Sequence, residues 1–193
     1  IYLMNLVIFG PPGAGKGTQS GYIAKKFKLY QLSTGELLRN EIKNNTNLGK
    51  QISSIINSGN LVSNELVSNL IEKYLSDKTY QNRIIFDGYP RTLIQAQTLN
   101  DSMIKYNQKI HIALRLTVSL DTIIKRIKER SALEKRDDDS EEIAIKRYET
   151  YEKNIKPVID FYKQSNLLKD VNGESSIIEI NNEISALIES IKG

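Results

Sequence analysis

The sequence predicts an α/β fold in which helices cover both faces of a parallel β-sheet. Residues 3–9 form a short apolar run that ends at a glycine, and residues 83–88 and 110–118 are also typical of buried strands. Segments with helical spacing separate these runs. Strands that alternate with helices form right-handed βαβ units, whose ligands bind beyond the carboxyl ends of the strands. Gly10 and Asp87 both stand at such ends.

The helices are predicted from the spacing of their apolar residues. They are expected at residues 16–27, 35–43, 48–58, 63–75, 92–105, 120–130, 140–163 and 183–192. The segment 33–75 does not fit the alternation of strands and helices, so we interpret it as an insertion on the sheet. The run "SIIEIN" at 176–181 is a further strand candidate, and Pro157 is expected to kink or interrupt its helix.

Length and composition indicate one globular domain, residues 1–193, that carries insertions. The chain is 39% hydrophobic and 26% charged, and no apolar run approaches the roughly 20 residues that cross a bilayer. There is no cysteine, which fits a reducing compartment, so we expect a cytoplasmic protein that does not enter membranes. The net charge of +4 comes mainly from lysines that lie beside acids, which argues against nucleic-acid binding. Residues 1–3 precede Met4 and are either a remnant or an upstream start.

A glycine-rich stretch, "IFGPPGAGKGTQ", connects the first strand to the first helix. Gly10, Gly15 and Lys16 match the phosphate-binding pattern GxxxxGK, but Gly17 replaces the usual hydroxyl residue and Thr18 supplies it one position later. Glycines allow a tight turn that aims N–H groups inward, and the following helix adds its positive N-terminal end. The alternative is a glycine-rich turn with a surface lysine.

Asp87 ends the apolar run at 84–86, at the same edge of the predicted sheet as the glycine loop. A carboxylate there can hold a water molecule bound to Mg²⁺, although many strands simply end in an Asp-Gly turn.

Several longer motifs together resemble the nucleoside monophosphate kinases, and among them the adenylate kinase family. "GPPGAGKGTQ" is similar to that family's form of the phosphate loop, and "DGYPRT" to its second signature. The resemblance extends through "LSTGELLR", "GNLV" and "KRDDDSEEIAIKRYETY" over nearly the whole chain. It implies a three-layer P-loop NTPase-type fold with a five-stranded parallel sheet, an NMP-binding insertion at 33–62 and a short lid at 129–139.

The resemblance also implies which residues bind each nucleotide. Those expected to contact ATP are Gly13, Ala14, Gly15, Lys16, Gly17, Thr18, Arg126, Arg130 and Gly173. Those expected to contact AMP are Thr34, Arg39, Asn60, Leu61, Val62, Gly88, Tyr89, Pro90, Arg91, Gln95, Arg136 and Arg147. Those expected to act on the transferred phosphoryl group are Lys16, Arg91, Arg126, Arg130, Arg136 and Arg147. Thr18 and Asp87 are expected to hold Mg²⁺, largely through water and ATP.

By this resemblance, the chain is an ATP:AMP phosphotransferase that forms two ADP and so balances adenine nucleotides. Thr34 and Thr92 resemble the AMP-specific forms. A kinase for CMP or UMP is the alternative, and a non-catalytic nucleotide sensor is a further one. The expected ligands are ATP, AMP, ADP and Mg²⁺, without structural zinc because the lid is short and lacks cysteine, and the expected state is a monomer. The resemblance leaves Arg115 without a role, apart from a strand-edge position or an ion pair.

Overall fold

The central feature of the fold is a five-stranded, fully parallel sheet. The computed structural model describes residues 3–134 and 140–191. The strands lie in the order β2-β3-β1-β4-β5, and their bounds are β1 Asn5–Phe9, β2 Tyr30–Ser33, β3 Ile84–Asp87, β4 Ile110–Thr117 and β5 Leu168–Asn172. Every residue of β1 is buried, as its position at the centre of the sheet requires.

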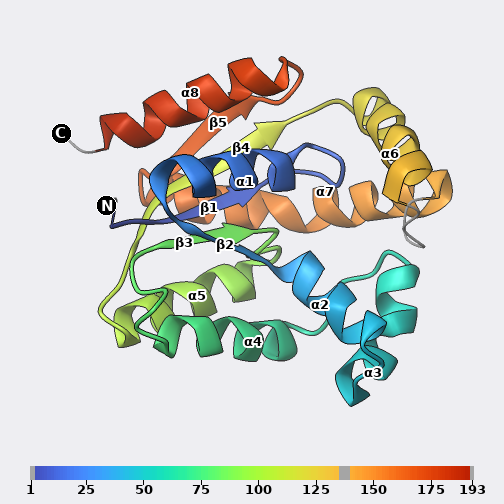
Figure 1. Cartoon of the computed structure of the whole chain (residues 1–193), viewed down its shortest axis with the longest axis horizontal. Coiled ribbons are helices and arrows are strands. Elements are labelled where there is room, and N and C mark those ends of the chain that lie inside the picture. The colour runs from blue at the N-terminus through green and yellow to red at the C-terminus, as the bar shows by residue number, and fades with distance from the viewer. Residues whose placement is uncertain (1–2, 135–139, 192–193) are drawn as a thin grey trace.

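Helices form the two outer layers of the molecule (Figure 1). Their bounds are α1 Lys16–Phe27, α2 Thr34–Lys43, α3 Asn47–Asn57, α4 Asn64–Ser76, α5 Leu93–Lys105, α6 Leu120–Glu134, α7 Glu141–Gln164 and α8 Ile177–Ser190. Helices α1 and α8 share one core cluster with the sheet, whereas α4, α5 and α7 share the other, which includes Phe9 and Phe86. The predicted α/β fold with a five-stranded parallel sheet is confirmed.

The short helices α2 and α3 pack closely on each other beside the carboxyl end of the sheet. Gly49 makes this approach possible, because a Cβ atom there would lie 2.0 Å from the Glu41 carbonyl oxygen. Helix α6 packs on α7 through Ile123, Ile127 and Ala144. The sheet, α2 and α6 therefore converge at one end of the molecule, which positions the site described below.

The prediction of a strand at 176–181 is wrong, because Ser176 is the N-cap of α8 and the helix begins at Ile177. The Ser176 hydroxyl oxygen accepts a hydrogen bond from the Glu179 N–H, and the Glu179 carboxylate accepts one from the Ser176 N–H. The two bonds form a complete capping box. Ile180, Ile184 and Ile188 then fall four residues apart on the buried face. Within α7, Pro157 does not interrupt the helix, which continues to Gln164.

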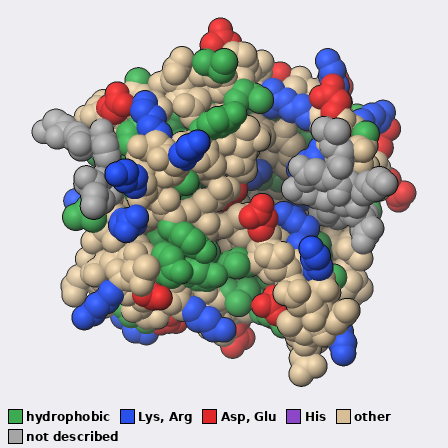
Figure 2. Space-filling view, in the orientation of Figure 1, with side chains coloured by type: hydrophobic (Ala, Val, Ile, Leu, Met, Phe, Trp, Pro, Cys, Tyr) green, Lys and Arg blue, Asp and Glu red, His purple; other side chains and the backbone are tan. Residues whose placement is uncertain are grey.

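Charged side chains of both signs lie scattered over the face seen in Figure 2. Among the helices that the structure describes, none has the length and apolar character required to span a membrane.

Candidate active site

The glycine loop lies between the end of β1 and the start of α1. Gly13 and Gly15 adopt positive φ angles of 80° and 92°, which glycine tolerates best. Helix α1 begins at Lys16 without a side-chain cap and with no acidic residue in its first turn. Its N-terminal N–H groups and its positive dipole end are therefore suited to an anion.

Lys16 folds back over this loop. Its Nζ donates to the carbonyl oxygens of Gly10 and Pro11, each at 2.9 Å. Burial lowers the pKa of Lys16 to about 7; nearby Asp87 opposes the shift, whereas the positive charges of Arg91 and Arg147 add to it.

Asp87 is the last residue of β3 and is buried. Its Oδ2 accepts a hydrogen bond of 3.0 Å from Gln31 Nε2, which comes from the edge strand β2. A Cβ atom on Gly17 would lie 3.7 Å from the same Oδ2, so the carboxylate adjoins the first turn of α1. The structure thus places Asp87 beside the phosphate loop, as predicted.

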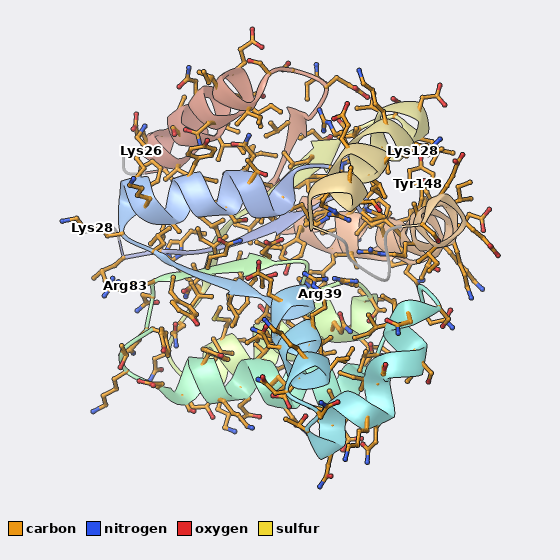
Figure 3. The ribbon with its side chains drawn as sticks, turned by 45° about the vertical axis from the view of Figure 1, so that its right-hand side comes forward. Lys26, Lys28, Arg39, Arg83, Lys128 and Tyr148 are labelled. Atoms are coloured by element: carbon orange, nitrogen blue, oxygen red, sulfur yellow. The ribbon has the colours of Figure 1, made fainter. Side chains whose placement is uncertain are left out.

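Two adjoining cavities open at this end of the sheet, and four basic residues belong to the walls of both. The first cavity has a volume of about 110 Å³ and the second about 760 Å³. The cationic residues that line both are Lys16, Arg39, Arg91 and Arg147. Figure 3 shows Arg39 where α2 meets the core, whereas Lys26, Lys28 and Arg83 lie toward the opposite end of the sheet.

The first cavity is bounded by the helical insertion, the segment that follows β3, and α7. It gathers most residues predicted to contact AMP: Thr34, Arg39, Asn60, Leu61, Val62, Gly88, Pro90, Arg91, Gln95 and Arg147. Tyr89 does not line it, because its side chain is buried in the core and contacts Ser68 Oγ through its hydroxyl. Leu38, Ile56, Val67 and Ile155 make part of the wall apolar, which suits the flat face of a base.

Hydrogen bonds within the protein orient the polar groups of the first cavity. The Gln95 amide oxygen accepts from the Arg91 N–H at 2.8 Å, while the Gly88 carbonyl accepts from Thr34 Oγ1 at 3.1 Å and from Arg91 Nε at 2.6 Å. Thr92 caps α5 by accepting from the Gln95 N–H. Because each side chain has an internal partner, their positions are set before a ligand arrives.

The second cavity is lined by the glycine loop, the start of α1, α6 and the start of α8. It includes these predicted ATP-contacting residues: Gly13, Ala14, Gly15, Lys16, Gly17, Thr18, Arg126 and Arg130. Asp87 also lines it. Gly173 is not part of the wall, but its carbonyl oxygen accepts from Arg126 Nη2 at 2.8 Å. Arg136 and part of the predicted lid fall outside the described residues.

Some lining residues were missed by sequence reasoning. Gln31 lines the second cavity and donates a hydrogen bond to Asp87. Because strand β2 was not predicted, no sequence signal indicated that Gln31 belongs to the site. Thr150, Tyr151 and Ile155 bring α7 into the first cavity. Their helical spacing predicts packing, and no motif distinguishes them from other core residues.

Arg115 and His111, which are not among the predicted site residues, have polar partners elsewhere in the fold. Arg115 on β4 forms a two-pronged ion pair with Asp170 on β5, with Nε to Oδ1 and Nη2 to Oδ2 both at 2.6 Å. The ion-pair interpretation of Arg115 is therefore confirmed. His111 Nδ1 accepts from the Asn5 N–H at 3.1 Å, and burial lowers the His111 pKa. Neither residue lines either cavity.

A phosphate loop on a parallel sheet, with two cavities that share a cationic wall, defines the class of P-loop phosphotransferases. Comparisons with known proteins specify the family. The family model described as adenylate kinase matches residues 8–167. The chain therefore belongs to the adenylate kinase family, which confirms the predicted resemblance and the predicted enzyme class, a nucleoside monophosphate kinase.

Relatives match over nearly the full chain. An adenylate kinase of Pelagibacter ubique is 40% identical over 212 aligned residues, covering 96% of this chain and all of the relative. One from Prochlorococcus marinus is 41% identical and covers 93% of this chain and 96% of the relative. One from Porphyromonas gingivalis is 37% identical and covers 98% of each.

Proposed function

We propose that this chain transfers the γ-phosphoryl group of ATP to AMP, reversibly, to form two ADP. Family membership supports this reaction, and the observation that carries it structurally is the wall shared by the two cavities. Two nucleotides seated in adjoining cavities would bring their phosphates together at Lys16, Arg39, Arg91 and Arg147. Neither the CMP or UMP alternative nor the sensor alternative has a specific observation in its favour.

The attacking atom is already an anionic oxygen of the AMP phosphate, so the protein need not supply a general base. Catalysis then depends on positioning and on neutralisation of the charge that the phosphoryl oxygens carry. Arginine suits this task because its planar guanidinium holds two phosphate oxygens at once. We assign Arg91, Arg147, Arg126 and Arg130 to the phosphates, with Arg136 as a further member of the group.

Mg²⁺ is the cofactor that fits the residues present. Within the described part of the chain, no group of three His, Cys, Asp or Glu side chains is arranged to hold a metal ion. The buried Asp87 carboxylate and the Thr18 hydroxyl instead suit an ion that is bound mainly by phosphates and water. Mg²⁺ is usually coordinated in this way. When bound, Mg²⁺ would neutralise charge on the ATP phosphates. Thr18 and Asp87 would hold its water shell.

Water competes with AMP as acceptor, so the site must exclude it before transfer. We assign this closure to the insertion at 33–62 and the lid at 129–139, within a single domain. A monomeric state and a cytoplasmic location also remain predictions.

The reaction is tested by measuring ADP formation from ATP and each of AMP, CMP, UMP and GMP. The proposal expects ADP formation with AMP to exceed that with the other three acceptors. Faster turnover with CMP or UMP would show that this nucleotide, and not AMP, is the preferred acceptor. Absence of transfer to any acceptor would favour a non-catalytic nucleotide sensor.

A further inference from the structure

Glu174 joins two connections that are far apart in the sequence. It lies between β5 and α8, and its carboxylate reaches the connection between β4 and α6. Oε1 accepts from the Ser119 N–H at 2.6 Å, and Oε2 accepts from Thr122 Oγ1 at 2.7 Å. These hydrogen bonds hold the pKa of the Glu174 carboxyl below its usual range, and the bond from the Ser119 N–H has the largest effect. Glu174 therefore places a negative charge at the N-terminus of α6, where the helix dipole favours it.

Gly173, the preceding residue, bonds the end of β4 and α6, on either side of the same connection. Its N–H donates to the Thr117 carbonyl oxygen at 2.9 Å, and its carbonyl oxygen accepts from Arg126 Nη2 at 2.8 Å. The approach is close, since a Cβ atom at 173 would lie 2.5 Å from Val118 Cγ2. The segment 172–174 thus contacts α6 at its start, through Glu174, and one turn further on, through Arg126.

Both joined connections leave the same end of the sheet, as Figure 1 shows. Both also lead into the second cavity: Ser175 and Ile177 line it from the α8 side, and Arg126 and Arg130 line it from α6. Glu174 is exposed and does not line the cavity itself. Glu174 is therefore placed to orient the wall of the second cavity rather than to touch a ligand.

We propose that Glu174 is a positioning residue for the phosphoryl donor: it anchors the start of α6 so that Arg126 and Arg130 face the donor phosphates. The inference rests on the proposed function, because it takes the second cavity, which is lined by the residues predicted to contact ATP, as the ATP site. The proposal predicts that loss of Glu174 weakens the binding of ATP selectively. The first cavity contains no residue of α6 or of the segment 172–177, so AMP binding should be little affected.

The test compares steady-state kinetics of Glu174→Ala and Glu174→Gln with the parent protein. The KM for ATP is expected to rise about tenfold in Glu174→Ala, as for the loss of a hydrogen bond to a charged group. Glu174→Gln keeps one acceptor oxygen, so its KM for ATP should lie between those of the parent protein and Glu174→Ala. The KM for AMP is expected to stay within about twofold of the parent value, because no residue of α6 or of the segment 172–177 lines the first cavity.

Glu72→Ala is the matched control. Glu72 on α4 is also a carboxylate that accepts two hydrogen bonds, in its case from Lys105 Nζ and Tyr106 Oη at the end of α5. It lines neither cavity, so both KM values should be unchanged. A drop in melting temperature shared by the Glu72 and Glu174 variants, without a change in KM for ATP, would make Glu174 a structural cap only and overturn the proposal.

A double-mutant cycle with Thr122→Val tests the route of the effect. If Glu174 acts through this contact, the effects of the two substitutions on KM for ATP will be less than additive. A fully additive pair, or equal increases in the KM values for ATP and AMP, would contradict the proposal. An unchanged KM for ATP in active Glu174→Ala would sink this inference while leaving the ATP-to-AMP reaction intact.

Discussion

Lys16 Nζ donates a hydrogen bond of 2.9 Å to the carbonyl oxygen of Gly10, within the phosphate loop itself. The ammonium thus bonds the loop backbone at the site where a nucleotide phosphate is expected. Burial lowers its pKa to about 7, so above that pH the lysine is mostly neutral in this structure. A bound phosphate would favour the charged form and raise the pKa again.

ATP binding should therefore take up a proton at Lys16 above pH 7. At pH 8 we expect uptake to approach about one proton per site, and the affinity to fall as pH rises further. Calorimetric titrations in two buffers of different ionisation enthalpy measure this uptake. Lys16→Met should abolish it, and a buffer-independent binding enthalpy in the parent protein would contradict the assignment.

The lowered pKa of Lys16 also makes the stability of the fold depend on pH. The folded pKa of about 7 lies below the usual lysine pKa of 10.5, so between these values the unfolded chain binds more protons than the folded chain. The Lys16 contribution to the free energy of unfolding therefore increases with pH across that window and is constant below it. Subtracting the pH profile of Lys16→Met from that of the parent isolates this contribution.

Removal of cations from the shared wall should stop the reaction. We expect Lys16→Met and Arg91→Ala each to lower kcat by at least about 10³-fold, the scale of arginine effects in phosphoryl transfer. The controls are Lys26→Met, on the same helix but paired with Glu189, and Arg83→Ala, whose guanidinium bonds the Lys28 carbonyl. Both controls should retain parental turnover. Near-normal turnover in the first two variants would remove the proposed mechanism.

Asp87→Asn should weaken the response to Mg²⁺. The substitution keeps an oxygen for the hydrogen bond from Gln31 but removes the charge beside the phosphate loop. Groups that orient a metal's ligands typically contribute about 10–100-fold to affinity or activity, so the half-saturating Mg²⁺ concentration should rise on that scale. A titration of turnover against Mg²⁺ at fixed ATP measures it. An unchanged curve would exclude Asp87 from the metal site.

The ion pair between Arg115 and Asp170 should matter little for catalysis. Their side chains are 25% and 51% exposed, and exposed pairs contribute about 0–1 kcal/mol. Asp170→Asn should therefore lower the free energy of unfolding by less than about 1 kcal/mol in a denaturant titration and leave both KM values unchanged. A large loss of activity in the folded variant would place Arg115 in the catalytic machinery after all.

The parts of the fold that were predictable are those with a strong local signal. Strand β1 is a continuous apolar run in the centre of the sheet, and α1, α5 and α7 show clear helical spacing and lie within a residue or two of their expected bounds. The glycine loop and the residues of "DGYPRT" were recognisable because phosphate binding restricts both backbone and side chains. Family resemblance then related distant residues such as Arg39 and Arg147, which spacing alone could not bring together.

The edge strands could not be predicted from apolar runs. Among the residues of β2 only Leu32 is buried, and among those of β5 only Val171, since each strand has a neighbour on one side alone. The isoleucines at the start of α8 produced the opposite error, because a short apolar run fits a strand and a helix equally well. The Glu174 contacts join residues over 50 positions apart, which no local pattern reveals.

A diadenosine polyphosphate, a single molecule with an adenosine at each end, tests most directly whether two nucleotides bind with their phosphates together. If the two cavities hold two nucleotides whose phosphates meet at the shared cationic wall, one such molecule should bind per chain and displace both ATP and AMP. Equilibrium competition against each labelled nucleotide measures this. Displacement of only one nucleotide, or binding of two inhibitor molecules per chain, would contradict the account.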